Sequence, residues 1–115
     1  MSDTHILEAL YNVLLTRKNA GGEKSYVASL YEKGSPKIAE KILEEAQEFI
    51  DEAYALDKDT HGTEAQKNIR SEAADLLFHM MVMLAHHDVP PAEVFEILGK
   101  RFGTSGHDEK ASRGA

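Results

Sequence analysis

Five carboxylates stand at helical spacing in two separate stretches of the chain. Glu44, Glu45 and Glu48 form the first stretch, and Glu72 and Asp75 form the second. The chain has no cysteine, and carboxylate oxygens without thiolates favour Mg²⁺ or Mn²⁺ over zinc. A cation held in this way neutralises phosphate oxygens, so the pattern predicts metal-assisted cleavage of a phosphoanhydride bond.

The first acidic stretch lies on a helix predicted over residues 36–57. Six apolar side chains gather on one side of it when residues are placed about 100° apart: Ile38, Ile42, Ala46, Phe49, Ile50 and Ala53. Glu45 and Glu48 lie along the border of this apolar side, whereas Glu44 lies nearly opposite it. The alternative is a solvated acidic face on which Lys41 pairs with Glu45, four residues later.

The second acidic stretch interrupts a helix predicted over residues 64–87. Residues 73–85 are apolar almost all round, which predicts a buried helix. Glu72, Asp75 and His79 nevertheless share one narrow stripe of it. A buried carboxylate is costly unless it is paired or bound to a metal, so the stripe favours a cation between the two helices. The alternative is a network of salt bridges. His79 is predicted to orient a carboxylate.

The elements around these stretches are predicted to be helices, and no segment alternates as a strand does. Helical periodicity and capping signals predict three further helices, over residues 4–18, 25–32 and 91–102. Ser35 is predicted to cap the 36–57 helix, with Pro36 in its first turn. The fold class is therefore all-α, a small helical bundle. Residues 1–103 are predicted to form one domain, and residues 104–115 a polar tail.

The charge balance excludes some classes of protein. Thirteen Lys and Arg face twenty Asp and Glu, for a net charge of −7, which argues against nonspecific nucleic-acid binding. No apolar run approaches the roughly 20 residues that cross a bilayer, and the first residues lack the layout of a signal peptide. We therefore expect a soluble, cytoplasmic protein without a nucleic-acid or membrane partner. A di-iron bundle is also disfavoured, because neither long helix contains Glu-x-x-His.

The two acidic stretches resemble the signature of the MazG-like all-α nucleoside triphosphate pyrophosphatases, since they read EExxE and then ExxD. Four wider segments narrow the resemblance to the phosphoribosyl-ATP pyrophosphatase family of histidine biosynthesis: SYVASLYEKG, KIAEKILEEAQE, SEAADLLFHMMVML and SGHDEKASR. The similarity runs from the first helix to Arg113. Two positions depart from the family pattern, because Leu43 replaces an expected glycine and Phe78 an expected tyrosine.

The resemblance implies a function and a set of site residues. It implies hydrolysis of phosphoribosyl-ATP to phosphoribosyl-AMP and pyrophosphate, with Mg²⁺ or with Mn²⁺ in its place. It also implies a homodimer in which two long antiparallel helices carry the site. All five acids are then catalytic, Glu45, Glu48, Glu72 and Asp75 bind the metal, and Glu44 is an outer group or the base. The expected substrate contacts are Lys24, Ser25, Tyr26, Lys33, Lys41 and His79. The tail residues Lys110, Ser112 and Arg113 are candidates to close over the substrate.

Two rival interpretations remain open at the level of sequence. A house-cleaning pyrophosphatase acting on ordinary or damaged nucleoside triphosphates would carry the same acids, and only the wider segments argue against it. A helical dimerisation module without catalytic activity would use the acids for salt bridges alone.

Overall fold

The structure is a computed structural model that describes residues 4–18, 25–58 and 63–103. Over these ranges the chain forms five helices and no strand: α1 (Thr4–Arg17), α2 (Tyr26–Lys33), α3 (Ser35–Lys58), α4 (Thr63–His86) and α5 (Pro91–Phe102). The predicted all-α class is confirmed, and every predicted helix end lies within one residue of the observed end. The predicted tail, 104–115, lies outside the described residues.

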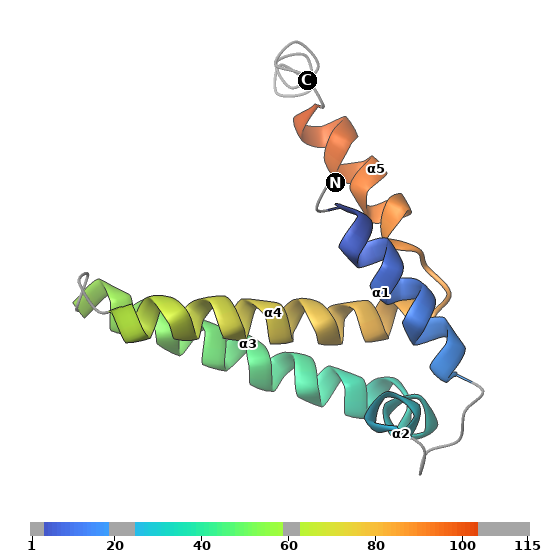
Figure 1. Cartoon of the computed structure of the whole chain (residues 1–115), viewed down its shortest axis with the longest axis horizontal. Helices are drawn as coiled ribbons and strands as arrows, with labels where there is room; N and C mark the ends of the chain where they lie inside the picture. The colour runs from blue at the N-terminus through green and yellow to red at the C-terminus, as the bar shows by residue number, and fades with distance from the viewer. Residues whose placement is uncertain (1–3, 19–24, 59–62, 104–115) are drawn as a thin grey trace.

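The two long helices form the body of the molecule. Figure 1 shows α3 and α4 lying side by side and running in opposite directions, with α2 at one end of the pair. The helix α1 crosses the C-terminal part of α4, and α5 packs against α1 on the side away from α3. Of all the helix pairs, α3 and α4 share the most extensive contact. An antiparallel pair of this kind brings acids from distant parts of the chain to the same level.

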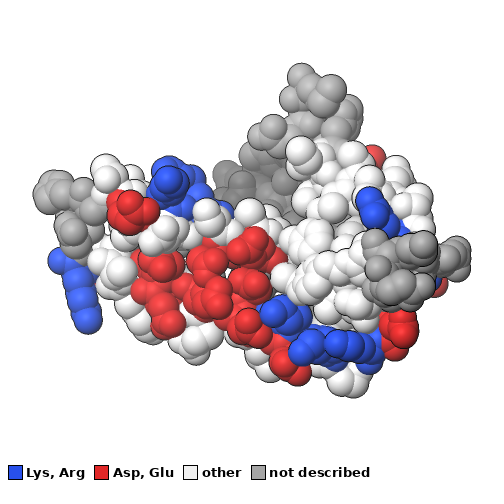
Figure 2. All heavy atoms as spheres, turned by 60° about the horizontal axis from the view of Figure 1, so that its bottom comes forward, with Lys and Arg blue, Asp and Glu red and all other residues white. Residues whose placement is uncertain are grey.

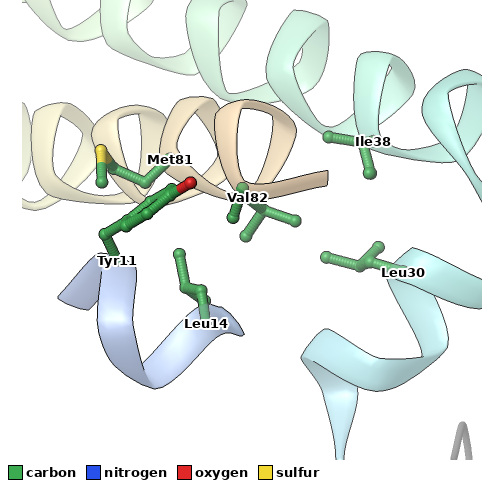
Figure 3. Close-up of a cluster of buried hydrophobic side chains, with 7 residues drawn as sticks. Tyr11, Leu14, Leu30, Ile38, Met81 and Val82 are labelled. Carbon is green, nitrogen blue, oxygen red and sulfur yellow. The ribbon is translucent and has the colours of Figure 1, made fainter. Parts of the chain in front are cut away.

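The hydrophobic core lies near the end of α4, where four helices converge. The largest fully buried side chains are Leu14 of α1, Leu30 of α2, Ile38 of α3 and Val82 of α4. Figure 3 shows these side chains pointing toward a common centre. The acids of α3 follow Ile38 in the chain, and those of α4 precede Val82. The core therefore anchors the helix pair at one end, and the acidic residues lie on the part that extends beyond it.

A single residue, Gly34, joins α2 to α3. Its N–H donates to the Leu30 carbonyl at 2.8 Å, and its own carbonyl accepts from the N–H groups of Lys37 and Ile38. The φ angle of Gly34 is +82°, a region that glycine adopts without the strain of a Cβ. The predicted cap is therefore displaced by one residue: Gly34 caps α3, and Ser35 lies in its first turn.

The expectation that α4 is buried all round is wrong for the single chain. Asp75 is exposed, and Leu77 and Met80 keep 48% and 45% of their surface accessible. On α3, Ile50 of the predicted apolar side is also 40% exposed. One long helix can be covered by its neighbours only on some sides, and the apolar periodicity does not say which. Within the described ranges, no helix combines the length and apolar character that crossing a membrane requires.

Candidate functional site

Carboxylates from the two long helices meet on one face of the molecule. Glu45 comes from α3, and Glu72 and Asp75 come from α4. One carboxylate oxygen from each lies within 4.8 Å of the others. Figure 2 shows acidic side chains gathered in one patch on this face, with Lys and Arg at its edges. The antiparallel arrangement of α3 and α4 thus brings together three of the four predicted metal ligands.

The fourth predicted ligand, Glu48, contacts this group from the next turn of α3. A hydrogen bond that protonated Glu72 donates to Glu48, followed by desolvation and the charges of the neighbouring acids, raises the pKa of Glu72 to about 7. Two carboxyl groups form such a bond only when one of them holds a proton. The four acids therefore repel one another at neutral pH, and a positively charged ligand would relieve that repulsion.

Glu45 is the most enclosed of these acids. Its side chain is only 12% exposed, and its Oε2 atom is buried with no hydrogen-bond partner. Burial first, and then the charges of Glu48 and Asp75, raise the pKa of Glu45. A buried carboxylate oxygen without a partner is costly. This orphaned oxygen, beside two further carboxylates, fits a cation-binding site better than a set of internal salt bridges.

The salt bridge that would have neutralised Glu45 is formed elsewhere. The ammonium of Lys41 lies 3.3 Å from Oε1 of Glu44, three residues along the helix. Glu44 is exposed, so this pair lies at the rim, as the helical periodicity predicted for Glu44. The alternative in which Lys41 pairs with Glu45 is therefore not found.

His79 lies directly beside the carboxylate group. It is 6% exposed, and its Nδ1 atom is 3.0 Å from the Asp75 carbonyl and 3.9 Å from Oε1 of Glu45. Its Nε2 atom is 2.8 Å from the hydroxyl of Tyr26. The ring of Phe78 meets the imidazole edge-on, with 5.1 Å between centroids. This is a position from which His79 can orient a carboxylate, the role expected for it.

The predicted substrate contacts on α2 lie at opposite ends of that helix. Ser25 and Tyr26 lie at the start of α2, where Ser25 Oγ accepts a hydrogen bond from the backbone N–H of Ala28 at 2.9 Å. Lys33 is exposed in the last turn of α2, at the end away from Tyr26. Ser25 therefore has a structural role as a helix cap, and Lys33 is set apart from Tyr26. Four further candidates lie outside the described residues: Lys24, Lys110, Ser112 and Arg113.

Lys41 remains on the side of the acids that faces α2. Its pKa is raised first by its hydrogen bond to Glu44 and then by its charge interaction with Tyr26. Tyr26 therefore contacts His79 and also interacts electrostatically with Lys41. Sequence reasoning missed this arrangement, because Tyr26 and His79 are 53 residues apart and no local pattern connects them.

Comparison with known proteins gives a consistent result over nearly the whole chain. The family model described as phosphoribosyl-ATP pyrophosphohydrolase matches residues 7–102. A phosphoribosyl-ATP pyrophosphatase of Geobacter sulfurreducens is 49% identical over 108 residues, which cover 94% of this chain and 93% of the relative. Proteins of the same name from Hydrogenovibrio crunogenus and Trichlorobacter lovleyi are each 45% identical, over 94% and 97% of this chain and 92% and 96% of their own lengths.

Proposed function

The chain belongs to the phosphoribosyl-ATP pyrophosphohydrolase family. We propose that its clustered carboxylates bind the Mg²⁺ that this hydrolysis requires. The chain is a hydrolase of histidine biosynthesis that cleaves phosphoribosyl-ATP to phosphoribosyl-AMP and pyrophosphate. The observation that carries the metal proposal is the unpartnered, buried Oε2 of Glu45 beside carboxylate oxygens of Glu72 and Asp75.

The proposed ligands are the three grouped acids together with Glu48. A site made only of carboxylate oxygens suits Mg²⁺, and Mn²⁺ as an alternative. The repulsion that raises the pKa of Glu72 favours any divalent cation that binds there. When bound, the cation neutralises phosphate charge and helps pyrophosphate to leave.

The other proposed roles belong to residues at the edges of the group. Lys41, whose ammonium is held by Glu44 at 3.3 Å, is placed to receive a phosphate oxygen at the rim. Glu44 then holds Lys41, or serves as the base that orients the attacking water. We assign Tyr26 to the wall of the substrate site, because it is half-exposed and lies beside His79. We assign Lys33, at the far end of α2, to a contact with a part of the substrate distant from the carboxylates.

A second copy of the chain is the proposed partner. An apolar cavity of about 200 Å³ opens between α1, α4 and α5, and Leu77, Met80 and Leu98 on its lining are about half exposed. Exposed apolar patches of this kind mark interaction surfaces, and a homodimer would cover them. Leu77→Lys should therefore give a monomer by light scattering, whereas Leu43→Lys, which changes an exposed leucine outside this cavity, should not.

The decisive experiment for function is pyrophosphate release from phosphoribosyl-ATP with and without Mg²⁺. We expect turnover that requires the cation and is lost in Glu45→Gln. The matched control is Glu40→Gln, which removes an exposed acid on the same helix that pairs with Lys37 at 3.0 Å. Faster turnover of ordinary nucleoside triphosphates than of phosphoribosyl-ATP would instead favour a house-cleaning enzyme. Equal activity in Glu45→Gln and the wild type would contradict the metal assignment. The proposed place of action is the cytoplasm.

A further inference from the structure

One buried imidazole touches three helices at the edge of the carboxylate group. His79 belongs to α4, and it contacts Tyr26 at the start of α2 and Glu45 in the middle of α3. These two contacts use different ring nitrogens, Nε2 for Tyr26 and Nδ1 for Glu45. Each nitrogen can therefore have its own role, and a substitution can remove the contact of one nitrogen while it keeps the contact of the other.

The Nδ1 side of the ring faces the proposed metal ligand. A backbone carbonyl only accepts hydrogen bonds, so the 3.0 Å contact with the Asp75 carbonyl means that Nδ1 carries a hydrogen. Oε1 of Glu45 lies 3.9 Å from the same nitrogen, close enough for electrostatic attraction. The Phe78 ring, edge-on at 88°, packs against the imidazole and opposes its rotation. The positive edge of the imidazole is thus held toward Glu45.

The Nε2 side of the ring faces the proposed substrate wall. Tyr26 is 50% exposed, yet its hydroxyl lies 2.8 Å from Nε2 and its ring meets the imidazole edge-on at 89°. A side chain this exposed would otherwise sample several rotamers. The contact with His79 therefore fixes an aromatic side chain beside Lys41, where a phosphate is proposed to bind.

We propose that His79 is a positioning residue with two separable tasks: through Nδ1 it holds Glu45 in place for the cation, and through Nε2 it holds Tyr26 in place for the substrate. This inference rests on the proposed function. It deepens that proposal, because it assigns cation affinity and substrate affinity to opposite edges of one side chain. An imidazole that merely satisfied core hydrogen bonds would affect stability alone.

Two substitutions separate the tasks. In His79→Asn the shorter amide can place its N–H near the position of Nδ1, and in His79→Gln the longer amide can place its oxygen near Nε2, where it accepts from the Tyr26 hydroxyl. We expect His79→Asn to behave like Tyr26→Phe, raising KM for phosphoribosyl-ATP about fivefold, the loss expected for one hydrogen bond, with kcat and Mg²⁺ affinity retained. We expect His79→Gln to lower Mg²⁺ affinity about tenfold, a usual effect of losing a group that orients a ligand.

The measurements are steady-state kinetics and calorimetric titration of the whole protein with Mg²⁺ alone. His87→Asn is the matched control, because His87 is an exposed histidine that contacts Ser35 outside the carboxylate group. The control should match the wild type in both measurements. Combining Tyr26→Phe with His79→Asn should raise KM no further than either change alone, since both remove the same contact.

The outcomes distinguish this inference from the proposal beneath it. Wild-type protein that neither binds Mg²⁺ nor releases pyrophosphate would overturn the proposed function and the inference with it. If the wild type is active but His79→Asn and His79→Gln change KM or Mg²⁺ affinity to the same extent, the inference is overturned and the proposed function stands. If the His79 variants do not fold, Tyr26→Phe still decides, because an unchanged KM in that folded variant contradicts the positioning of Tyr26.

Discussion

The middle of α4 and the residues just after its C-terminus surround carboxylates with opposite charges. Just after its C-terminus, the carboxylate of Asp88 lies 2.7 Å from the ammonium of Lys18, and this hydrogen bond and charge lower the pKa of Asp88. In its N-terminal half, Glu72 meets Glu48 instead, and the pKa of Glu72 rises to about 7. Asp88 is thus paired with a lysine of the protein itself, whereas Glu72 is surrounded by other carboxylates. A carboxylate left with like charges is therefore a better sign of a ligand site than an acidic residue as such.

The largest expected effect is on turnover. Asp75→Asn and Asp88→Asn make the same chemical change in the middle of α4 and just after its C-terminus. Asp75→Asn should lower pyrophosphate release by about 100-fold or more, the scale of losing a group that stabilises transition-state charge, whereas Asp88→Asn should leave it nearly unchanged. A steady-state assay on phosphoribosyl-ATP checks this. Similar losses in both variants would mean that the different surroundings of Asp75 and Asp88 have no bearing on activity.

The next effect is stabilisation by metal. At a free Mg²⁺ concentration 100 times Kd, the free energy of unfolding should rise by about 2.7 kcal/mol, or roughly 10 °C in Tm. Calorimetry with and without Mg²⁺ measures the shift. Asp88→Asn should retain it and Asp75→Asn should lose most of it. A shift that survives in Asp75→Asn would place the cation elsewhere.

A smaller effect is the pH dependence of the metal-free protein. Folded Glu72 holds its proton up to about pH 7, whereas the unfolded chain releases it near 4.5. The folded state binds more protons within this window, so the free energy of unfolding should decrease as pH rises from 4.5 to 7. Urea titrations in a chelator measure this slope.

The control for this slope is Glu72→Gln, which should flatten it. The lowered pKa of Asp88 acts in the opposite sense: its contribution to stability is present above pH 3.8 and is lost as the pH falls below that value. Because the lowered pKa of His86 acts in the opposite sense in the same pH window, the test is the difference between the two proteins, and an unchanged slope in Glu72→Gln would contradict the repulsion among the acids.

The smallest expected effect comes from breaking the ion pair between Lys18 and Asp88. Lys18→Met removes an ion pair in which Asp88 is largely exposed, and exposed pairs contribute little. Tm should fall by no more than about 3 °C, and the loss should shrink at high salt because salt screens the pair. Thermal unfolding at two ionic strengths checks this. A large, salt-independent loss would show that Lys18 contributes mainly through packing, for instance over the ring of Tyr31.

Local sequence patterns predicted the helices well, because their signals are local. Pro91 opens α5 as predicted, whereas Ser25, predicted as the first residue of a helix, is the residue that caps α2. The meeting of Glu45 with Glu72 and Asp75 was also predictable, since both stretches border apolar faces that must pack together. Glu44 was correctly expected at the rim for the same reason.

Other features depend on tertiary structure and had no local signal. The apolar run around Leu77 predicted burial, but how many neighbours cover a helix depends on the whole assembly. Lys41 had acceptable partners at both three and four residues away, and the side-chain rotamers selected Glu44. The contact between Tyr26 and His79 required knowledge of how α2 packs against α4.

The one-residue joint at Gly34 has a consequence for engineering. Because Gly34 both ends α2 and begins α3, no slack separates Tyr26 from the helix that carries Glu45. A Cβ at this position would find room, with Pro36 Cδ at 3.8 Å, but the φ of +82° would be strained. Inserting a flexible linker here would therefore uncouple the two helices that carry Tyr26 and Glu45, both residues of the proposed site, while leaving each helix intact. A designer seeking to graft a new loop or tag onto this scaffold should therefore avoid the junction at residue 34.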